Sequence, residues 1–425
     1  MPRLTICGGG NAAHVLIALA AKAGWEVDVY APLADEARRL RAGITAAGGI
    51  TARFAGESIV GIPHHISADP AEVIPESDVI LLALPAFAHG PTLEAIAGFI
   101  KPNVCLGAVP ARSGFDFQAR SILNERGLSP RIFGLQTLPW ACRIAIYGQT
   151  VDILGTKAET ALAISPPDES SDWTRQLTTL FGLELVAVDS FLTLTLANTG
   201  QLIHPGIMYG LSRNKESKTF GQNEIPLFYQ GVDPTTAELL QAMSDEVQAI
   251  TIELADRLSD FKTNDVLPIY DWLLRSYPNY ISDGSTLQRA FNTNRAYAGL
   301  RFPTRSTGPD TFVVDYKARY LSEDVPYGLA VIRGMAELVD VRTPTIDKVI
   351  DWAQARLGRQ YVANGTLSGR DLAETRAPQV YGLLTLAGLV SSRYMEPGCR
   401  DWVYEVTKKC PLKRRIFPAM PISGE

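Results

Sequence analysis

The sequence predicts an α/β domain built on a doubly wound sheet, followed by an all-α domain. Three patterns carry this prediction. The sequence opens with a strand, a glycine-rich turn and a helix; strand and helix patterns then alternate to about residue 189; and helical periodicity dominates from residue 190 onward. Alternation of this kind is typical of a parallel sheet with right-handed crossovers. A chain of 425 residues is also expected to hold two domains.

The glycine-rich turn follows an apolar strand over residues 4–7 and leads into an apolar helix over residues 15–23. It fits the pattern G-x-G-x-x-A with Gly8, Gly9, Gly10, Asn11, Ala12 and Ala13. The first glycine allows a tight turn, the second lets backbone N–H groups approach a pyrophosphate, and the small last residue lets the helix pack on the strand. We therefore predict a Rossmann-type dinucleotide site here; the alternative is an ordinary strand-to-helix loop.

The choice between NAD and NADP stays open at this point. An acidic residue that binds the adenosine ribose is expected at the end of the second strand, residues 26–30, where the sequence instead has Tyr30. Asp28 is close, but strand alternation turns its side chain elsewhere. Arg38 or Arg39 could meet the 2′-phosphate of NADP, although a solvated helix face is the more ordinary interpretation.

The remaining elements of the first domain follow in order. We predict a helix over 33–41, a hairpin or short meander over 50–66, strands over 77–85, 104–109, 131–135, 151–154, 161–164 and 184–188, and helices over 115–126 and 172–181. The strand over 77–85 is almost continuously apolar, as expected of a parallel strand covered on both faces. Because such strands end at the cofactor crevice, we expect Pro85, Ala86 and Phe87 to line it.

The second domain is expected to be helical, over residues 190–395. Helical periodicity covers 192–209, 235–258, 268–277, 285–292, 325–339, 345–357 and 382–391, with prolines near the ends of these segments. The basic segment 396–425 is expected to form a surface tail. The first domain then comprises residues 1–189.

Composition excludes several classes of function. The net charge is −5 and no basic cluster precedes the tail, which argues against nucleic-acid binding. No apolar run is long enough to span a membrane, and no signal sequence is recognised, so a cytoplasmic protein is expected. The five cysteines show no close pairing, and the five histidines form no metal-binding pattern.

Chemistry is expected between the two domains, where the second domain would face the cofactor. His204 is the histidine of that domain, and it can exchange a proton with a carbonyl group as hydride is transferred. A satisfied core histidine is the competing interpretation. Asp324 precedes a proline-containing helix start, so it either caps that helix or orients His204. Arg319 could bind a substrate carboxylate through its guanidinium fork.

Seven segments together make the chain resemble the opine dehydrogenase family of the octopine dehydrogenase type. They are CGGGNAAH (7–14), LPAFAHG (84–90), TLPWACRI (137–144), HPGIMYG (204–210), PLFYQG (226–231), RYLSEDVP (319–326) and TRAPQVYG (375–382). The resemblance implies that an amino acid and a 2-oxo acid such as pyruvate condense to an imine, which NADH reduces. It implies NAD as the cofactor, His204 as the acid and base, Asp324 as its partner and Arg319 as the anchor of the 2-oxo acid.

Two departures from the family pattern bear on the amine. Gln136 and Arg112, both expected at the substrate pocket, stand where octopine-type members carry Glu and Gln. This disfavours a cationic amine such as arginine and favours a neutral, acidic or taurine-like one, with Arg112 as a second contact for an anion. The resemblance also places Thr137, Cys142 and Trp272 at the substrate pocket, although Trp272 equally suits a helix core. Two alternatives remain: a dehydrogenase of 2-hydroxy acids with the same domain plan, and a non-catalytic dinucleotide sensor. We expect a monomer or homodimer.

Overall fold

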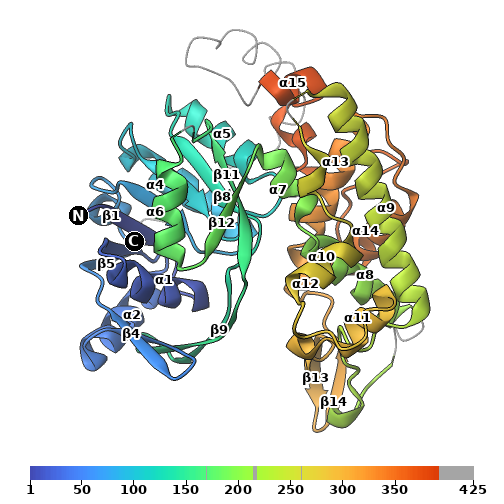
Figure 1. The fold of residues 1–425 in the computed structure, drawn as a ribbon, viewed down its shortest axis with the longest axis horizontal. Coiled ribbons are helices and arrows are strands. Elements are labelled where there is room, and N and C mark those ends of the chain that lie inside the picture. Colours follow the sequence, from blue (N-terminus) through green and yellow to red (C-terminus); the bar gives the residue numbers. More distant parts are fainter. Residues whose placement is uncertain (169, 214–217, 260, 392–425) are drawn as a thin grey trace, which may run out of the picture.

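The computed structural model describes residues 1–168, 170–213, 218–259 and 261–391. These residues form two lobes that lie side by side, one built on strands and the other mainly on helices (Figure 1). The chain passes from the first lobe to the second between β12 (Glu184–Val188) and α7 (Phe191–Ala197). The predicted basic tail, 396–425, lies outside the described residues.

The first lobe contains an eight-stranded sheet in the order β12-β11-β8-β7-β6-β1-β2-β5. Its other strands are β1 (Arg3–Cys7), β2 (Glu26–Tyr30), β5 (His65–Ser67), β6 (Val79–Leu82), β7 (Cys105–Ala108), β8 (Arg131–Leu135) and β11 (Glu159–Ser165). All neighbours pair in parallel except β8 and β11. The predicted Rossmann-type sheet is therefore confirmed.

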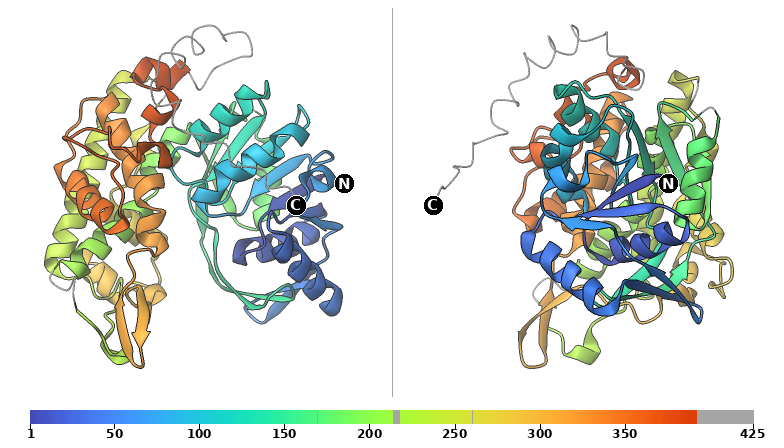
Figure 2. Two further views of the ribbon diagram at one scale, coloured as in Figure 1. Left: turned by 180° about the vertical axis from the view of Figure 1, so that it is seen from behind. Right: turned by 90° about the vertical axis from the view of Figure 1, so that its left-hand side faces the viewer.

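Alternation along the buried strands gives this sheet two apolar cores, one on each face. Leu81 packs with α1 (Asn11–Lys22), α2 (Ala34–Ala47) and α6 (Asp172–Phe181), whereas Ile80 and Leu82 pack with α3 (Pro70–Val73), α4 (Ala86–Ile96) and α5 (Phe115–Glu125). Helices therefore cover both faces of the sheet (Figure 2).

The strand order reverses at β1, which lies between β2 and β6. In the register of this pair, Cys7 lies beside Leu82, so the turn after β1 and the turn after β6 lie side by side. Ligands of doubly wound sheets bind at the carboxyl ends of the strands at such a switch point. The sheet thus brings the glycine turn and the start of α4 to one crevice.

A second sheet has the order β4-β3-β10-β9. The predicted hairpin appears as β3 (Ile50–Phe54) and β4 (Glu57–Gly61), and the predicted strand 151–154 extends to β10 (Thr150–Thr156). The strand β9 (Trp140–Ile146) was not predicted; it pairs antiparallel with β10 through two register shifts. Such bulges break the simple alternation by which a strand is recognised.

The second lobe is mostly helical, but it differs from the prediction in several places. Its helices are α8 (Gly200–Ser212), α9 (Pro234–Arg257), α10 (Ile269–Ser276), α11 (Leu287–Thr293), α12 (Arg319–Ser322), α13 (Ala330–Leu338), α14 (Pro344–Leu357) and α15 (Leu386–Ser391), besides α7. The single helix expected over 192–209 is broken at Asn198, and Pro205 lies inside α8 rather than near its end. A hairpin of β13 (Thr304–Gly308) and β14 (Thr311–Val314) was not predicted; it projects from this lobe (Figure 1).

Within the described residues no helix has the length and apolar character needed to cross a membrane.

Candidate active site

The glycine turn has the geometry that a pyrophosphate requires. Gly8 has φ +121°, a backbone conformation that favours glycine. A side chain placed on Gly10 would point into open space, and α1 starts at the next residue without a side-chain cap on its first N–H groups. These N–H groups and the helix dipole suit an anion, so the turn fits the phosphates of a dinucleotide.

The other residues predicted to bind the cofactor differ in how far their side chains are buried. Phe87 is exposed and Pro85 half-buried, whereas the Ala13 side chain packs in the core beneath the turn. The Asn11 side chain accepts a hydrogen bond from the Ile144 N–H of β9 at 2.7 Å, so it fastens the turn to the second sheet. Tyr30 is buried in the apolar core on the α4 side of the sheet, and its backbone oxygen accepts a hydrogen bond from the Gly8 N–H at 2.8 Å.

The charged residues near β2 are already paired. Asp28 is buried and its carboxylate lies 3.3 Å from His64 Nδ1, in agreement with the expectation that it points elsewhere. Arg38 and Arg39 both contact the carboxylate of Asp35. Arg39 also lies over the ring of Tyr147, with its guanidinium carbon 4.8 Å from the ring centroid.

His204 lies on α8, with both ring nitrogens hydrogen-bonded. Nδ1 is 2.8 Å from Asp324 Oδ2, and Nε2 is 2.8 Å from the hydroxyl of Tyr229. Tyr320 stacks on the ring with centroids 4.3 Å apart. Because a carboxylate accepts hydrogen bonds, we assign a proton to Nδ1; in the neutral ring Nε2 then accepts from Tyr229.

Asp324 is the partner of His204 and does not cap the following helix. Its side chain makes no capping hydrogen bond, and its second oxygen, Oδ1, accepts a hydrogen bond from Arg112 Nη1 at 2.7 Å. The capping interpretation is therefore wrong. Asp324 is almost fully buried, and a buried carboxylate is stable when it is paired in this way.

Arg112 reaches Asp324 from the other lobe. It lies in the loop after β7 with φ +58°, and its side chain is largely buried at the interface between the lobes. Burial alone would lower its pKa, but the charges of Asp324 and Glu323 outweigh this and raise the pKa of Arg112 above its usual value. The network His204, Asp324 and Arg112 therefore spans the interface.

Arg319 begins α12, close to this network in the chain, and most of its side chain is exposed. Its Nε donates to Glu323 Oε2 at 2.5 Å. The other oxygen of Glu323 accepts a hydrogen bond from the Ala86 N–H, the first residue of α4, at 2.9 Å. Glu323 itself is 1% exposed. Glu323 thus links Arg319, the predicted anchor of the 2-oxo acid, to the turn after β6, whose residues Pro85, Ala86 and Phe87 are predicted to line the cofactor crevice. We call this turn the cofactor turn.

Three further residues predicted at the substrate each have a different partner in the fold. The Gln136 amide donates to the backbone oxygen of Ala197 at 2.5 Å, across the interface. The Thr137 hydroxyl lies 3.3 Å from that of Thr160. Trp272 on α10 is half-buried and packs edge-on against Tyr277.

Cys142 does not face the interface between the lobes. Its side chain is 2% exposed and packs in the apolar core beside α1. Burial raises the pKa of the thiol to about 11. The expected contact between Cys142 and a substrate therefore finds no support in this structure, because alternation along β9 turns the thiol inward.

Sequence reasoning missed three residues that hold the site together: Tyr229, Glu323 and Arg376. Each lies in a segment that carries the family resemblance, yet none was assigned a role. Arg376 is completely buried and donates hydrogen bonds to the backbone oxygens of Ala86 and Ala111 and to Gln118. A signal was present for Glu323, since it directly precedes Asp324.

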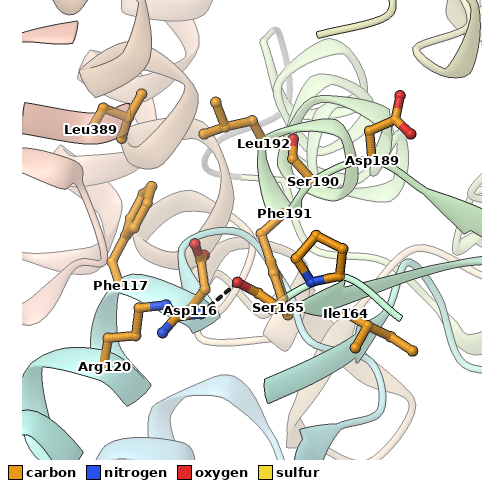
Figure 3. A pocket seen from close by; sticks show the side chains of 11 residues that line it. Asp116, Phe117, Arg120, Ile164, Ser165, Asp189, Ser190, Phe191, Leu192 and Leu389 are labelled. Carbon is orange, nitrogen blue, oxygen red and sulfur yellow. Dashed lines mark hydrogen bonds between the residues drawn. The ribbon is translucent and has the colours of Figure 1, made fainter. Parts of the chain in front are cut away.

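A cavity at the junction of the lobes lies apart from these residues. It is lined by side chains of α5, the end of β11 and the start of α7, where Arg120 donates a hydrogen bond to Ser165 (Figure 3). None of the predicted site residues lines it. In the described residues no cluster of His, Cys, Asp and Glu side chains is arranged to hold a metal ion.

Comparison with known proteins identifies the family. A family model described as the α-helical domain of NAD/NADP octopine/nopaline dehydrogenases matches residues 187–357. An opine dehydrogenase from Haliotis discus hannai is 38% identical over 403 residues, which cover 91% of this chain and 98% of that protein. The chain belongs to the octopine dehydrogenase family.

Other relatives agree with this assignment. A tauropine dehydrogenase from Arabella iricolor is 34% identical over 396 residues, covering 91% of this chain and 99% of that protein. A solved octopine dehydrogenase with NADH and L-arginine superimposes with a TM-score of 0.85 at 34% identity, covering 93% and 99% of the two chains. Like other members of the octopine dehydrogenase family, this protein is an NAD-dependent oxidoreductase, as predicted.

Proposed function

We propose that this enzyme joins an amino acid or a taurine-like amine to a 2-oxo acid such as pyruvate and reduces the resulting imine to a secondary amine, with His204 as the acid and base. With an amino acid as the amine the product is a secondary-amine dicarboxylate. The observation that carries the proposal is the hydrogen-bonded pair of His204 and Asp324, 2.8 Å apart, at the interface of the two lobes. Asp324 also accepts a hydrogen bond from Arg112 of the first lobe at 2.7 Å, so the pair lies against the lobe that carries the glycine turn.

The glycine turn would hold the phosphates of NADH, and the bound cofactor would supply a hydride to the imine carbon. Asp324 fixes the tautomer of His204 and stabilises its protonated form. His204 Nε2 exchanges a proton with the oxygen of the 2-oxo acid as the carbonyl group is converted to an imine and water leaves. For this exchange the substrate oxygen must replace or join the Tyr229 hydroxyl at Nε2. Arg319 binds the carboxylate of the oxo acid.

We also propose a neutral, acidic or taurine-like amine in preference to arginine. Gln136 offers an amide where a carboxylate would attract a guanidinium, and Arg112 adds a positive charge to the same interface. Arg112 is held by Asp324, so it acts on the amine through its charge rather than as a free anchor. A relative named tauropine dehydrogenase is compatible with this preference.

The proposed reaction is tested by measuring NADH oxidation with pyruvate and a panel of amines: L-arginine, L-alanine, L-glutamate, glycine and taurine. Turnover must depend on an added amine, and taurine or a neutral or acidic amino acid should give the highest kcat/KM. Equal turnover without amine would instead indicate reduction of the oxo acid to a 2-hydroxy acid. A preference for L-arginine would contradict the proposed amine class and leave the reaction type standing.

The role of His204 is tested by His204→Ala, with His65→Ala as the matched control on the exposed end of β5. Loss of general acid and base catalysis is expected to lower kcat by about 100-fold or more, while NADH still binds. His65→Ala should behave as wild type. Unchanged turnover in His204→Ala would remove the catalytic assignment.

A further inference from the structure

Arg143 is an exposed arginine of the first lobe whose charge is not paired with a carboxylate. It lies on β9, the outer strand of the second sheet. Within the described residues its guanidinium makes one hydrogen bond, from Nη1 to the backbone oxygen of Cys142 at 3.0 Å, and no ion pair. The carboxylate opposite it on β10, Asp152, is held by Arg53 instead, at 2.6 Å. Most of the N–H donors of Arg143 are therefore available to a ligand.

The course of β9 brings Arg143 beside the glycine turn. Cys142 packs in the core next to α1, so alternation turns the following side chain, that of Arg143, to the opposite face of the strand. Ile144 then donates its N–H to the Asn11 side chain of the glycine turn at 2.7 Å. Arg143 thus precedes a residue that is fastened to the glycine turn, and its own side chain projects away from the core.

From this position Arg143 acts on the second lobe close to the predicted catalytic histidine. Burial raises the pKa of Tyr320, whereas the hydrogen bond with Tyr229 and the positive charge of Arg143 oppose this rise. Because such an effect of charge falls with distance, Arg143 lies close to the interface between the lobes. Tyr320 stacks on His204, and the Tyr229 hydroxyl is 2.8 Å from Nε2 of His204. Arg143 is therefore turned toward the Nε2 side of His204, where the proposed reaction takes place.

The proposed amines share an acid group, and neither Arg112 nor Arg319 is available to bind it. L-Alanine and L-glutamate carry an α-carboxylate, and taurine carries a sulfonate. An anion that leaves water for an enclosed site needs a positive partner. Arg112 is engaged by Asp324 at 2.7 Å, and Arg319 is assigned to the 2-oxo acid. The acid group of the amine therefore needs a further cation at the interface.

We propose that Arg143 binds the acid group of the amine substrate, either a carboxylate or a sulfonate. The inference rests on the proposed function. A guanidinium donates two parallel hydrogen bonds to two oxygens of one acid group. One arginine then serves amino acids and taurine alike, and an amine without an acid group is a poor substrate.

The first test compares Arg143→Gln with wild type on an accepted amine and on ethylamine. Ethylamine is what remains of L-alanine without its carboxylate and of taurine without its sulfonate, so it isolates the contribution of the acid group. Wild type should prefer the accepted amine by about 100-fold or more in kcat/KM, and Arg143→Gln should lose about 100-fold of this preference, because a hydrogen bond between charged groups is removed.

The loss should appear in the KM of the amine, while kcat and the KM of pyruvate stay close to wild type. If ethylamine is not turned over, the KM of the accepted amine decides alone. A purely structural defect would lower kcat and thermal stability without this split. An unchanged KM of the amine in Arg143→Gln would overturn the inference.

The second measurement does not depend on turnover. Isothermal titration calorimetry of the enzyme–NADH complex with L-alanine, L-glutamate and taurine, without pyruvate, gives the dissociation constant of each amine. Arg143→Gln should raise this constant by about 100-fold for the amine that wild type binds best. If wild type shows no amine-dependent turnover, the proposed function fails, while this titration still decides whether Arg143 binds an acid group. Absence of binding to wild type would also overturn the inference.

Arg131→Gln is the matched control. Arg131 begins β8, at the edge of the sheet opposite the cofactor crevice, and it also donates to backbone oxygens, those of Pro166 and Pro167 at 3.2 Å. Its substitution should leave the KM of the amine and the preference over ethylamine unchanged. If Arg131→Gln and Arg143→Gln give the same values, the inference is wrong.

Two further outcomes keep the test decisive. Arg143→Lys keeps the charge but not the fork, so its KM for the amine should lie between those of wild type and Arg143→Gln. If Arg143→Gln does not fold, a wild-type KM in Arg143→Lys overturns the inference. A higher dissociation constant for NADH in Arg143→Gln, with an unchanged KM for the amine, would assign Arg143 to the phosphates of the cofactor and overturn it as well.

Discussion

His204 is held from both sides by groups that come from distant parts of the second lobe. Asp324 is 120 residues away and Tyr229 is 25 residues away along the chain. The Tyr229 ring is buried and stacks on Tyr297 with centroids 4.0 Å apart. Burial raises the pKa of Tyr229 well above its ordinary value, so its hydroxyl stays protonated and can donate to Nε2.

Tyr229→Phe should therefore lower kcat with little change in fold. The substitution removes one hydroxyl and leaves the stacked ring, and loss of a hydrogen bond between neutral groups is expected to cost about 0.5–1.5 kcal/mol, or roughly 2- to 10-fold in rate. Steady-state kinetics and thermal unfolding of the variant check this. Tyr297→Phe is the control, because Tyr297 packs on Tyr229 without touching His204. Equal kcat values in the two variants would exclude a role for the Tyr229 hydroxyl.

At the scale of single residues, the sequence predicted which residues belong to the site better than it predicted which of them contact each other. His204, Asp324 and Arg112 were all singled out, but no spacing rule brings together residues separated by the fold. The role of Asp324 was open because an aspartate before a proline is an equally good cap. Tyr229 and Glu323 were missed because a tyrosine in an apolar segment and a glutamate in a helix usually need no explanation.

At the scale of secondary structure, the break between α7 and α8 positions the histidine. Asn198 has ψ 83°, outside the helical region, and α8 begins two residues later. The new helix presents His204 toward Asp324 one turn after its start. The polar residues in this segment were noticed in the sequence as an interruption of an apolar helix. That they end one helix and begin another depends on packing against the first lobe.

The turn between β10 and β11 contains a lysine whose charge is poorly solvated. Lys157 Nζ donates to the backbone oxygen of Leu138 at 2.8 Å, and burial lowers its pKa to about 8. Below pH 8 the folded protein must hold this charge away from water, whereas above the ordinary lysine pKa of about 10.4 both states are neutral. The charge of Lys157 therefore lowers the free energy of unfolding at neutral pH. This destabilisation disappears as the pH rises from about 8 to about 10.4.

Lys157→Met should stabilise the protein at pH 7, and its advantage over wild type should shrink as the pH rises from 8 to 10.5. Thermal unfolding of both proteins across this range measures the difference, and effects of other titrating groups cancel in it. A difference that stays constant with pH would show that the charge of Lys157 carries no cost in the folded state.

At the scale of the whole molecule, the fold class of each lobe could be predicted from its own sequence, but the interface between the lobes could not. Periods of two and of 3.6 residues report which face of an element is buried, and both classes of domain follow from them. They do not report which lobe covers that face. Arg376 illustrates this: it is completely buried, but its acceptors are two backbone oxygens and one amide oxygen in the other lobe, which leave no pattern in the sequence.

Arg376→Met should weaken the contact between the two lobes and lower the affinity for the dinucleotide. The variant leaves the oxygens of Ala86 and Ala111 without their donor, at an expected cost of about 1–3 kcal/mol each, partly offset because a buried charge is removed. Denaturant unfolding should show lower stability, and fluorescence titration a higher dissociation constant for NADH. Arg370→Met, on the exposed surface of the same lobe, is the control. If both variants bind NADH as wild type does, Arg376 does not support the cofactor turn.

The position of these contacts along the chain affects the order of assembly during translation. Ala86 is made early, but Glu323 and Arg376, which complete its surroundings, leave the ribosome only after more than half of the chain has followed. Domains fold as units in the order of their synthesis, so the first lobe must fold and wait with its contact surface uncovered. That surface is where a nascent chain of this enzyme is most open to chaperones and to pairing with a wrong partner.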